Sequence, residues 1–162
     1  MSQLVATFFY VGYLKPAPGT WGSLTALPVA LVVLWITGPY GLFFMSIVAF
    51  GAGYWATVQQ TRGQADHDPS EIVIDEVAGQ WIALLPVAFG AANNDVSYLA
   101  LWPGWIAAFV LFRLFDITKP WIIGWADRRN DAMGVMLDDV IAGVFAAIGV
   151  GALAAVCHVV LV

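Results

Sequence analysis

The sequence predicts an all-α integral membrane protein with about five apolar helices, some of them short or re-entrant, and a polar site at the cytoplasmic face. Of its 162 residues, 61% are hydrophobic and only 10% are charged, whereas about a quarter of the residues in a soluble domain are charged. Apolar runs also alternate with short polar segments along the chain. We therefore expect a single membrane-embedded domain that covers residues 1–162.

The expected helices correspond to five apolar stretches, which are residues 24–37, 40–58, 80–92, 98–115 and 140–162. A helix needs about 20 apolar residues to cross a bilayer. The last stretch meets this length, whereas the first and third are short, so each of these two is either extended by its neighbours or re-entrant. Residues 1–14 lack the basic start and cleavage site of a signal peptide, and we expect them at the interface or in a partial helix.

Two turn signals arrange these stretches in hairpins. Gly38-Pro39 separates the first two stretches, and "AANNDVS" at residues 91–97 separates the third from the fourth. Two hairpins would bring the remaining polar segments to one side of the membrane. All six basic residues lie in these segments, namely Lys15, Arg62, Arg113, Lys119, Arg128 and Arg129. Because lysine and arginine in short loops mark the cytoplasmic side, we expect this face to be cytoplasmic.

Two similar motifs carry the acidic residues of the predicted site. "IDEVAGQW" begins at residue 74 and "LDDVIAGV" at residue 137, and each sets two adjacent acids before Ala-Gly and an apolar run. The small Ala-Gly pair would let another helix approach closely, so two such helix starts would form one cluster of four carboxylates. These are Asp75, Glu76, Asp138 and Asp139. Helix capping alone explains one such pair, but two pairs on one face favour a site that needs a cation, and oxygen ligands suit Mg²⁺ or Mn²⁺.

A third motif, "FRLFDITKPW", adds an acid and two cations at the same face. Arg113 and Asp116 are three residues apart, so they share a helix face and a local ion pair is one interpretation. Asp116 is otherwise a further metal ligand. Arg113 and Lys119 are candidates to bind phosphate oxygens.

The segment that contains Gly19, Thr20, Gly22 and Ser23 predicts a glycine-rich loop ahead of an apolar helix. Backbone N–H groups in such a loop can bind phosphate, although a simple turn with a Ser/Thr cap gives the same pattern. The segment lacks the spacing of a nucleotide-binding P-loop.

Composition excludes several other functions. A net charge of −5 argues against a nucleic-acid partner. The single cysteine, Cys157, cannot form an internal disulfide, and the two histidines make no zinc motif. His67 lies among acids in a polar segment, where contact with water is its simplest role.

Four motifs in this order, "PAPGTWGSLTALP", "DPSEIVIDEVAGQW", "FRLFDITKPW" and "MGVMLDDVIAGV", resemble the phosphatidylglycerophosphatase A family over residues 12–144. The resemblance implies a Mg²⁺-dependent enzyme of phospholipid biosynthesis, embedded as a multi-pass protein in the bacterial cytoplasmic (inner) membrane. Such an enzyme hydrolyses the phosphate monoester of phosphatidylglycerol phosphate. Its implied functional positions are Gly19, Thr20, Gly22, Ser23, Asp75, Glu76, Arg113, Asp116, Lys119, Asp138 and Asp139.

Residue types and resemblance together suggest three roles. The catalytic residues would be Asp75, Glu76, Asp138 and Asp139, and the Mg²⁺ ligands would be these four with Asp116. The phosphate of the phospholipid substrate would contact Thr20, Ser23, Arg113 and Lys119. We favour attack by a metal-activated water, with one of the four catalytic acids accepting its proton, although a phospho-aspartate intermediate and either one or two ions remain alternatives.

Other functions fit the sequence less well. Another membrane lipid-phosphate phosphatase is the nearest alternative. A CDP-alcohol phosphatidyltransferase would need a longer aspartate motif that the chain lacks. A small ion-coupled transporter would place acids in the middle of the membrane, and none is expected there.

Overall fold

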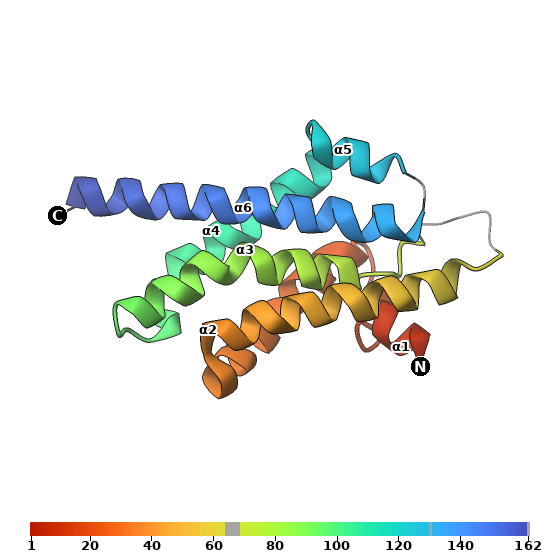
Figure 1. Cartoon of the computed structure of the whole chain (residues 1–162), viewed down its shortest axis with the longest axis horizontal. Helices are drawn as coiled ribbons and strands as arrows, with labels where there is room; N and C mark the ends of the chain where they lie inside the picture. Colours follow the sequence, from red (N-terminus) through yellow and green to blue (C-terminus); the bar gives the residue numbers. More distant parts are fainter. Residues whose placement is uncertain (64–68, 130, 162) are drawn as a thin grey trace.

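The computed structural model describes residues 1–63, 69–129 and 131–161, and within these ranges every regular element is a helix (Figure 1). The all-α class predicted from composition is therefore confirmed. The elements in chain order are α1 Ser2–Ala6, η1 Val11–Tyr13, α2 Pro18–Thr61, α3 Ile74–Asn93, η2 Tyr98–Leu101, α4 Trp102–Thr118, α5 Ile122–Asp127 and α6 Ala132–Leu161.

Among the described residues, three helical segments are long and apolar enough to cross a membrane, fewer than the five apolar helices expected. They are Pro18–Thr61, Tyr98–Thr118 and Ala132–Cys157. Two features explain the difference. The first two apolar stretches both lie in α2, and α3 carries two acids and Gln80 in its first two turns.

Within α2, Gly38 marks the first predicted hairpin turn. Its backbone angles are φ 70° and ψ −171°, a conformation that side-chain-bearing residues rarely adopt. The two parts of α2 run in opposite directions (Figure 1), and Gly38 is the residue between them with non-helical angles. The second hairpin is also present, because α4 returns along α3 after a connection that follows Asn93.

The two hairpins separate the molecule into two ends. Figure 1 places the reversal within α2, the α3–α4 connection and the end of α6 at one end. The N-terminus, the end of α2, the start of α3, helix α5 and the start of α6 lie at the other. The polar segments therefore gather as expected, and this second end is called the polar end below.

Helices α3 and α6 cross in close contact at their two Ala-Gly pairs. A Cβ atom on Gly143 would lie 2.4 Å from the carbonyl oxygen of Gly79, and one on Gly79 would lie 2.5 Å from the carbonyl oxygen of Asp139. Ala78 and Ala142 are fully buried beside these glycines. The role predicted for the small pairs is thus confirmed, and the crossing brings the two acidic motifs together.

The N-terminal segment packs against the chain that leads into α3. The backbone N–H of Val73 donates to the carbonyl oxygen of Ala6 at 2.9 Å. A Cβ atom on Gly12 would lie 1.9 Å from the carbonyl oxygen of Glu71, so only glycine fits there without a shift of the backbone. This segment therefore supports the first turn of α3.

Candidate active site

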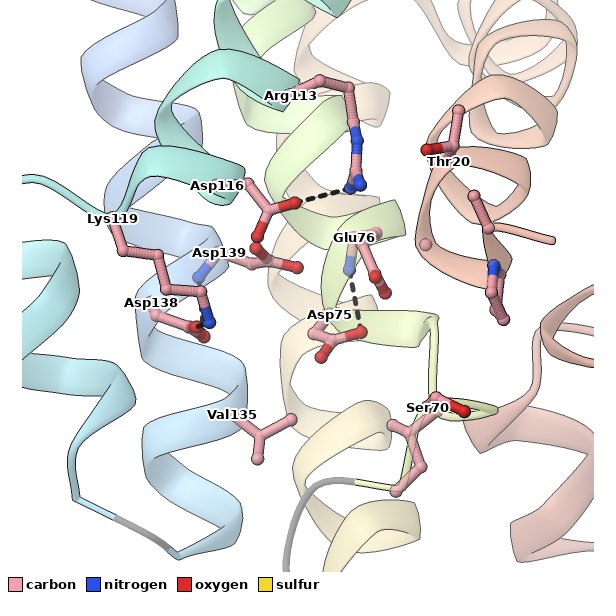
Figure 2. Close-up of a pocket in the computed structure, with 14 residues that line it drawn as sticks. Thr20, Ser70, Asp75, Glu76, Arg113, Asp116, Lys119, Val135, Asp138 and Asp139 are labelled. Atoms are coloured by element: carbon pink, nitrogen blue, oxygen red, sulfur yellow. Dashed lines mark hydrogen bonds and ion pairs between the residues drawn. The ribbon is translucent and has the colours of Figure 1, made fainter.

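A polar cavity of about 280 Å³ lies at the polar end, among the starts of α2 and α3, the end of α4 and the second turn of α6 (Figure 2). Five acids and two cations make up half of the residues that line it. The lining residues are Ala17, Pro18, Gly19, Thr20, Ser70, Ile72, Asp75, Glu76, Arg113, Asp116, Lys119, Val135, Asp138 and Asp139. Of the side chains predicted to act in the site, all except Ser23 reach this cavity.

Three of the five acids converge within the cavity. One carboxylate oxygen from each of Asp75, Glu76 and Asp139 lies within 4.8 Å of the other two (Figure 2). Asp75 and Asp139 are buried, and the buried atoms Glu76 Oε2 and Asp139 Oδ1 find no hydrogen-bond donor in the described part of the chain. Buried carboxylates without partners are costly. The donor set therefore suits a hard divalent cation.

The two acidic motifs share one local contact but differ in their place on the helix. Asp75 Oδ1 accepts a hydrogen bond from the Glu76 N–H at 2.9 Å, and Asp138 Oδ1 accepts one from the Asp139 N–H at 3.0 Å. The first pair lies in the first turn of α3, as predicted.

The second acidic pair is not at a helix start, which corrects the prediction. Helix α6 begins at Ala132, so Asp138 and Asp139 lie almost two turns inside it. The reason is an earlier cap, because Asp131 Oδ1 accepts a hydrogen bond from the Gly134 N–H at 2.7 Å. The helix dipole therefore contributes little to stabilising a negative charge on Asp139.

Arg113 forms the ion pair with Asp116 that the spacing allowed. Its Nη1 lies 2.5 Å from Asp116 Oδ2, and the same nitrogen donates to Ser23 Oγ at 3.4 Å. The Nε atom is buried and has no acceptor among the described residues. Ser23 is itself fully buried and also donates to the carbonyl oxygen of Gly19 at 2.9 Å. In this structure Ser23 therefore positions Arg113 instead of lining the cavity.

Lys119 is held between two carboxylates. It is the C-cap residue of α4, and its Nζ contacts Asp127 of α5 and lies 2.7 Å from Asp138 Oδ2. Partial burial favours the neutral amine, but hydrogen bonds and ion pairs with the two acids outweigh it and raise the pKa of Lys119 above its usual value. The ammonium is therefore charged throughout the neutral range.

The segment Gly19–Ser23 forms the first turns of α2, and the predicted loop is wrong. Pro18 stands at the helix start, where proline is favoured because its ring is already in the helical conformation. Ala17, the N-cap residue, has no side chain that could cap the helix. The first N–H groups of α2, at Gly19 and Thr20, have no intrahelical acceptor, and both residues line the cavity.

The sequence did not predict the burial of Gln80. It is fully buried four residues after Glu76 on α3, and neither amide atom has a partner within the described ranges. Its only signal is an amide at the start of an apolar run. His67, also singled out above, lies outside the described residues.

Comparison with known proteins gives consistent results. A family model described as phosphatidylglycerophosphatase A matches residues 4–154. A phosphatidylglycerophosphatase A of Haemophilus influenzae is 36% identical over 152 residues, which cover 93% of this chain and 87% of that protein. One from Escherichia coli is 37% identical over 148 residues, covering 90% and 78%.

A third relative has a different name. A protein of Bacteroides thetaiotaomicron named "Putative phosphatidylinositol-3-phosphatase" is 37% identical over 147 residues, which cover 88% of this chain and 86% of that protein. No solved structure matches the chain at a significant level.

Proposed function

We propose, from the premise that the chain belongs to the phosphatidylglycerophosphatase A family, that this phosphatase hydrolyses the terminal phosphate monoester of phosphatidylglycerol phosphate. The products would be phosphatidylglycerol and inorganic phosphate, and the reaction would serve phospholipid biosynthesis. The proposal includes Mg²⁺ as the cofactor and a multi-pass location in the bacterial inner membrane, with the cavity on the cytoplasmic side.

One observation carries the proposal, namely that phosphate-binding groups share one cavity with two buried carboxylate oxygens, Glu76 Oε2 and Asp139 Oδ1, that have no donor among the described residues. Asp75, Glu76 and Asp139 would hold Mg²⁺. The unmatched oxygens of Glu76 and Asp139 fit this cation, since they need positive charge that the described part of the chain does not supply. When bound, the ion would stabilise charge on the phosphoryl oxygens and lower the pKa of a coordinated water.

The remaining groups of the cavity would bind and orient the substrate. The helix start at Gly19 and Thr20 offers N–H donors to an anion, and the Thr20 hydroxyl is beside them. Arg113 adds a fixed positive charge that Ser23 and Asp116 orient. One of the cavity carboxylates would accept the proton of the attacking water.

Charge and apolar surface support the proposed orientation. All six basic residues lie in the three polar segments that the hairpins bring to one side, and an excess of lysine and arginine marks the cytoplasmic face. The exposed side chains further along the helices are large and apolar, such as Trp35, Val110 and Ile148. The acyl chains would remain in the bilayer along these faces while the headgroup enters the cavity.

The first test is phosphate release by the purified protein in detergent. We expect release from phosphatidylglycerol phosphate with Mg²⁺, and none after EDTA treatment until Mg²⁺ is restored. The name of the Bacteroides relative makes phosphatidylinositol 3-phosphate the most informative second substrate, with phosphatidic acid as a third. Preference for either of these over phosphatidylglycerol phosphate would overturn the substrate assignment, and full activity in EDTA would overturn the metal requirement.

A Gly19→Ala substitution is expected to reduce phosphate release with little loss of thermal stability. The new Cβ would lie 2.1 Å from Glu76 Oε1 and 3.3 Å from Arg113 Nη1. Both atoms end flexible side chains, so they can move away, but Glu76 would then leave the carboxylate group. Gly51→Ala, also in α2, is the matched control because no atom lies within 4 Å of the place where its new methyl group would stand. Similar thermal midpoints are expected for the two variants. Equal phosphate release by both would contradict the placement of Gly19 at the site.

A further inference from the structure

The five acids of the cavity differ in their partners. Arg113 pairs with Asp116, and Lys119 pairs with Asp138. Asp75, Glu76 and Asp139 instead form the group whose oxygens lie within 4.8 Å of one another. Two of the acids are thus held by cations of the chain, and the other three each direct one oxygen to a shared point.

We infer that the centre takes a single divalent cation, and that the Lys119 ammonium acts as a built-in second cation beside Asp138. The inference rests on the proposed function and deepens it, because it assigns the number of ions and changes the expected role of two residues. Asp138 would position Lys119 and would not be a metal ligand. Lys119 would act through its fixed charge at the cavity wall.

The contacts of Asp138 support this assignment. Its Oδ1 accepts the Asp139 N–H at 3.0 Å, and its Oδ2 lies 2.7 Å from Lys119 Nζ. Asp138 is also buried, with 5% of its surface exposed. Both oxygens are therefore engaged before any ion enters, in contrast to Asp139, whose Oδ1 is buried without a donor from the described residues.

The backbone of Lys119 is held by two contacts, and its ammonium by two carboxylates. The residue ends α4 in a left-handed conformation, and its N–H donates to the carbonyl oxygen of Phe115 at 2.8 Å. Gly124 of α5 packs on its carbonyl group, since a Cβ there would lie 2.6 Å from the Lys119 oxygen. Asp127, on the same short helix, also contacts the ammonium.

A second ion would have to displace these cations. Paired ions in phosphatase centres lie about 3.5–4 Å apart and need carboxylates on both sides. The acids that could complete a second position beside Asp139 are Asp116 and Asp138, which already hold Arg113 and Lys119. Cations at contact distance repel a divalent ion strongly.

The test is the number of Mn²⁺ ions bound per chain by the purified protein in detergent, measured by equilibrium binding and electron paramagnetic resonance. We expect one uncoupled Mn²⁺ in the wild type and a second bound ion in Lys119→Met, because this change removes the ammonium that Asp127 and Asp138 share. Arg129→Met is the matched control, since Arg129 pairs with Asp131 on the surface at the same end. It should bind one ion.

Two coupled ions in the wild type would overturn the inference, as would a folded Lys119→Met protein that still binds one. Asp138→Asn provides an independent check should Lys119→Met fail to fold. It should keep one Mn²⁺ at an affinity close to that of the wild type, whereas a loss of the ion would make Asp138 a ligand and overturn the assignment. An active wild type with two ions would leave the proposed function intact, whereas a wild type that binds none would overturn the metal requirement itself.

Discussion

Asp139→Asn is expected to abolish divalent-cation binding and to lower Mg²⁺-dependent phosphate release by more than about 100-fold, the upper end of the loss seen for residues that only support a ligand. Asp139 is 3% exposed, and its Oδ1 has no donor in the described part of the chain, so this oxygen is available to a cation. Asparagine keeps the shape and removes the charge. Asp75→Asn should act in the same way, because Asp75 belongs to the same group.

Stability separates this loss from unfolding. Without the ion, Asp139→Asn removes one of several buried like charges, so its thermal midpoint in metal-free buffer should equal or exceed that of the wild type. Asp131→Asn is the control, because asparagine caps a helix as well as aspartate does and Asp131 contacts Gly134 and Arg129 at the surface. Its activity should be unchanged. Normal turnover in both Asp75→Asn and Asp139→Asn would remove the carboxylate group from the mechanism.

Gly143→Val is expected to lower both thermal stability and activity. Its Cβ would lie 2.4 Å from the carbonyl oxygen of Gly79 and 3.0 Å from that residue's Cα. Because backbone atoms cannot rotate away as a side chain can, α3 and α6 would have to separate. Overpacking of this kind costs about 1–3 kcal/mol. Separation would also move Asp139 away from Asp75 and Glu76, so Mn²⁺ affinity should fall with the thermal midpoint.

The same helix offers a control for this change. Gly151 also lies in α6, but no atom is within 4 Å of the position that its Cβ would take. Gly151→Val should therefore leave phosphate release, Mn²⁺ affinity and the thermal midpoint near the wild-type values. If the two valine variants behave alike, close contact at Gly143 does not hold the site together.

Features that depend on local chemistry could be predicted from the sequence. Gly38-Pro39 predicts a reversal because the first residue tolerates positive φ and the second cannot donate to a continuing helix. The Ala-Gly pairs predict a close crossing because they lack side chains that would hold two helices apart, and the crossing is present at Gly79 and Gly143.

Other features depend on contacts between distant segments. Helix α6 starts earlier in the chain than predicted, because Asp131 caps it. From the sequence alone, a polar residue before "AMGVM" is compatible with either a helix cap or a loop. The partner of Lys119 could not be predicted, since Asp127 and Asp138 reach it from two further helices. The motif spacing predicted that all five acids lie together, but not which of their oxygens already contact a cation of the chain. It also gave no sign that Gln80 would be buried without a partner among the described residues.

The contact between the N-terminal segment and the chain before α3 bears on how this enzyme should be handled. Deleting the first 12 residues would remove the carbonyl oxygen of Ala6 that accepts from the Val73 N–H, and the close contact of Gly12 with Glu71. The turn that carries Asp75 and Glu76 would then lose its support. A purification tag is better fused after the last helix, whose end lies far from the cavity, at the opposite end of the molecule (Figure 1).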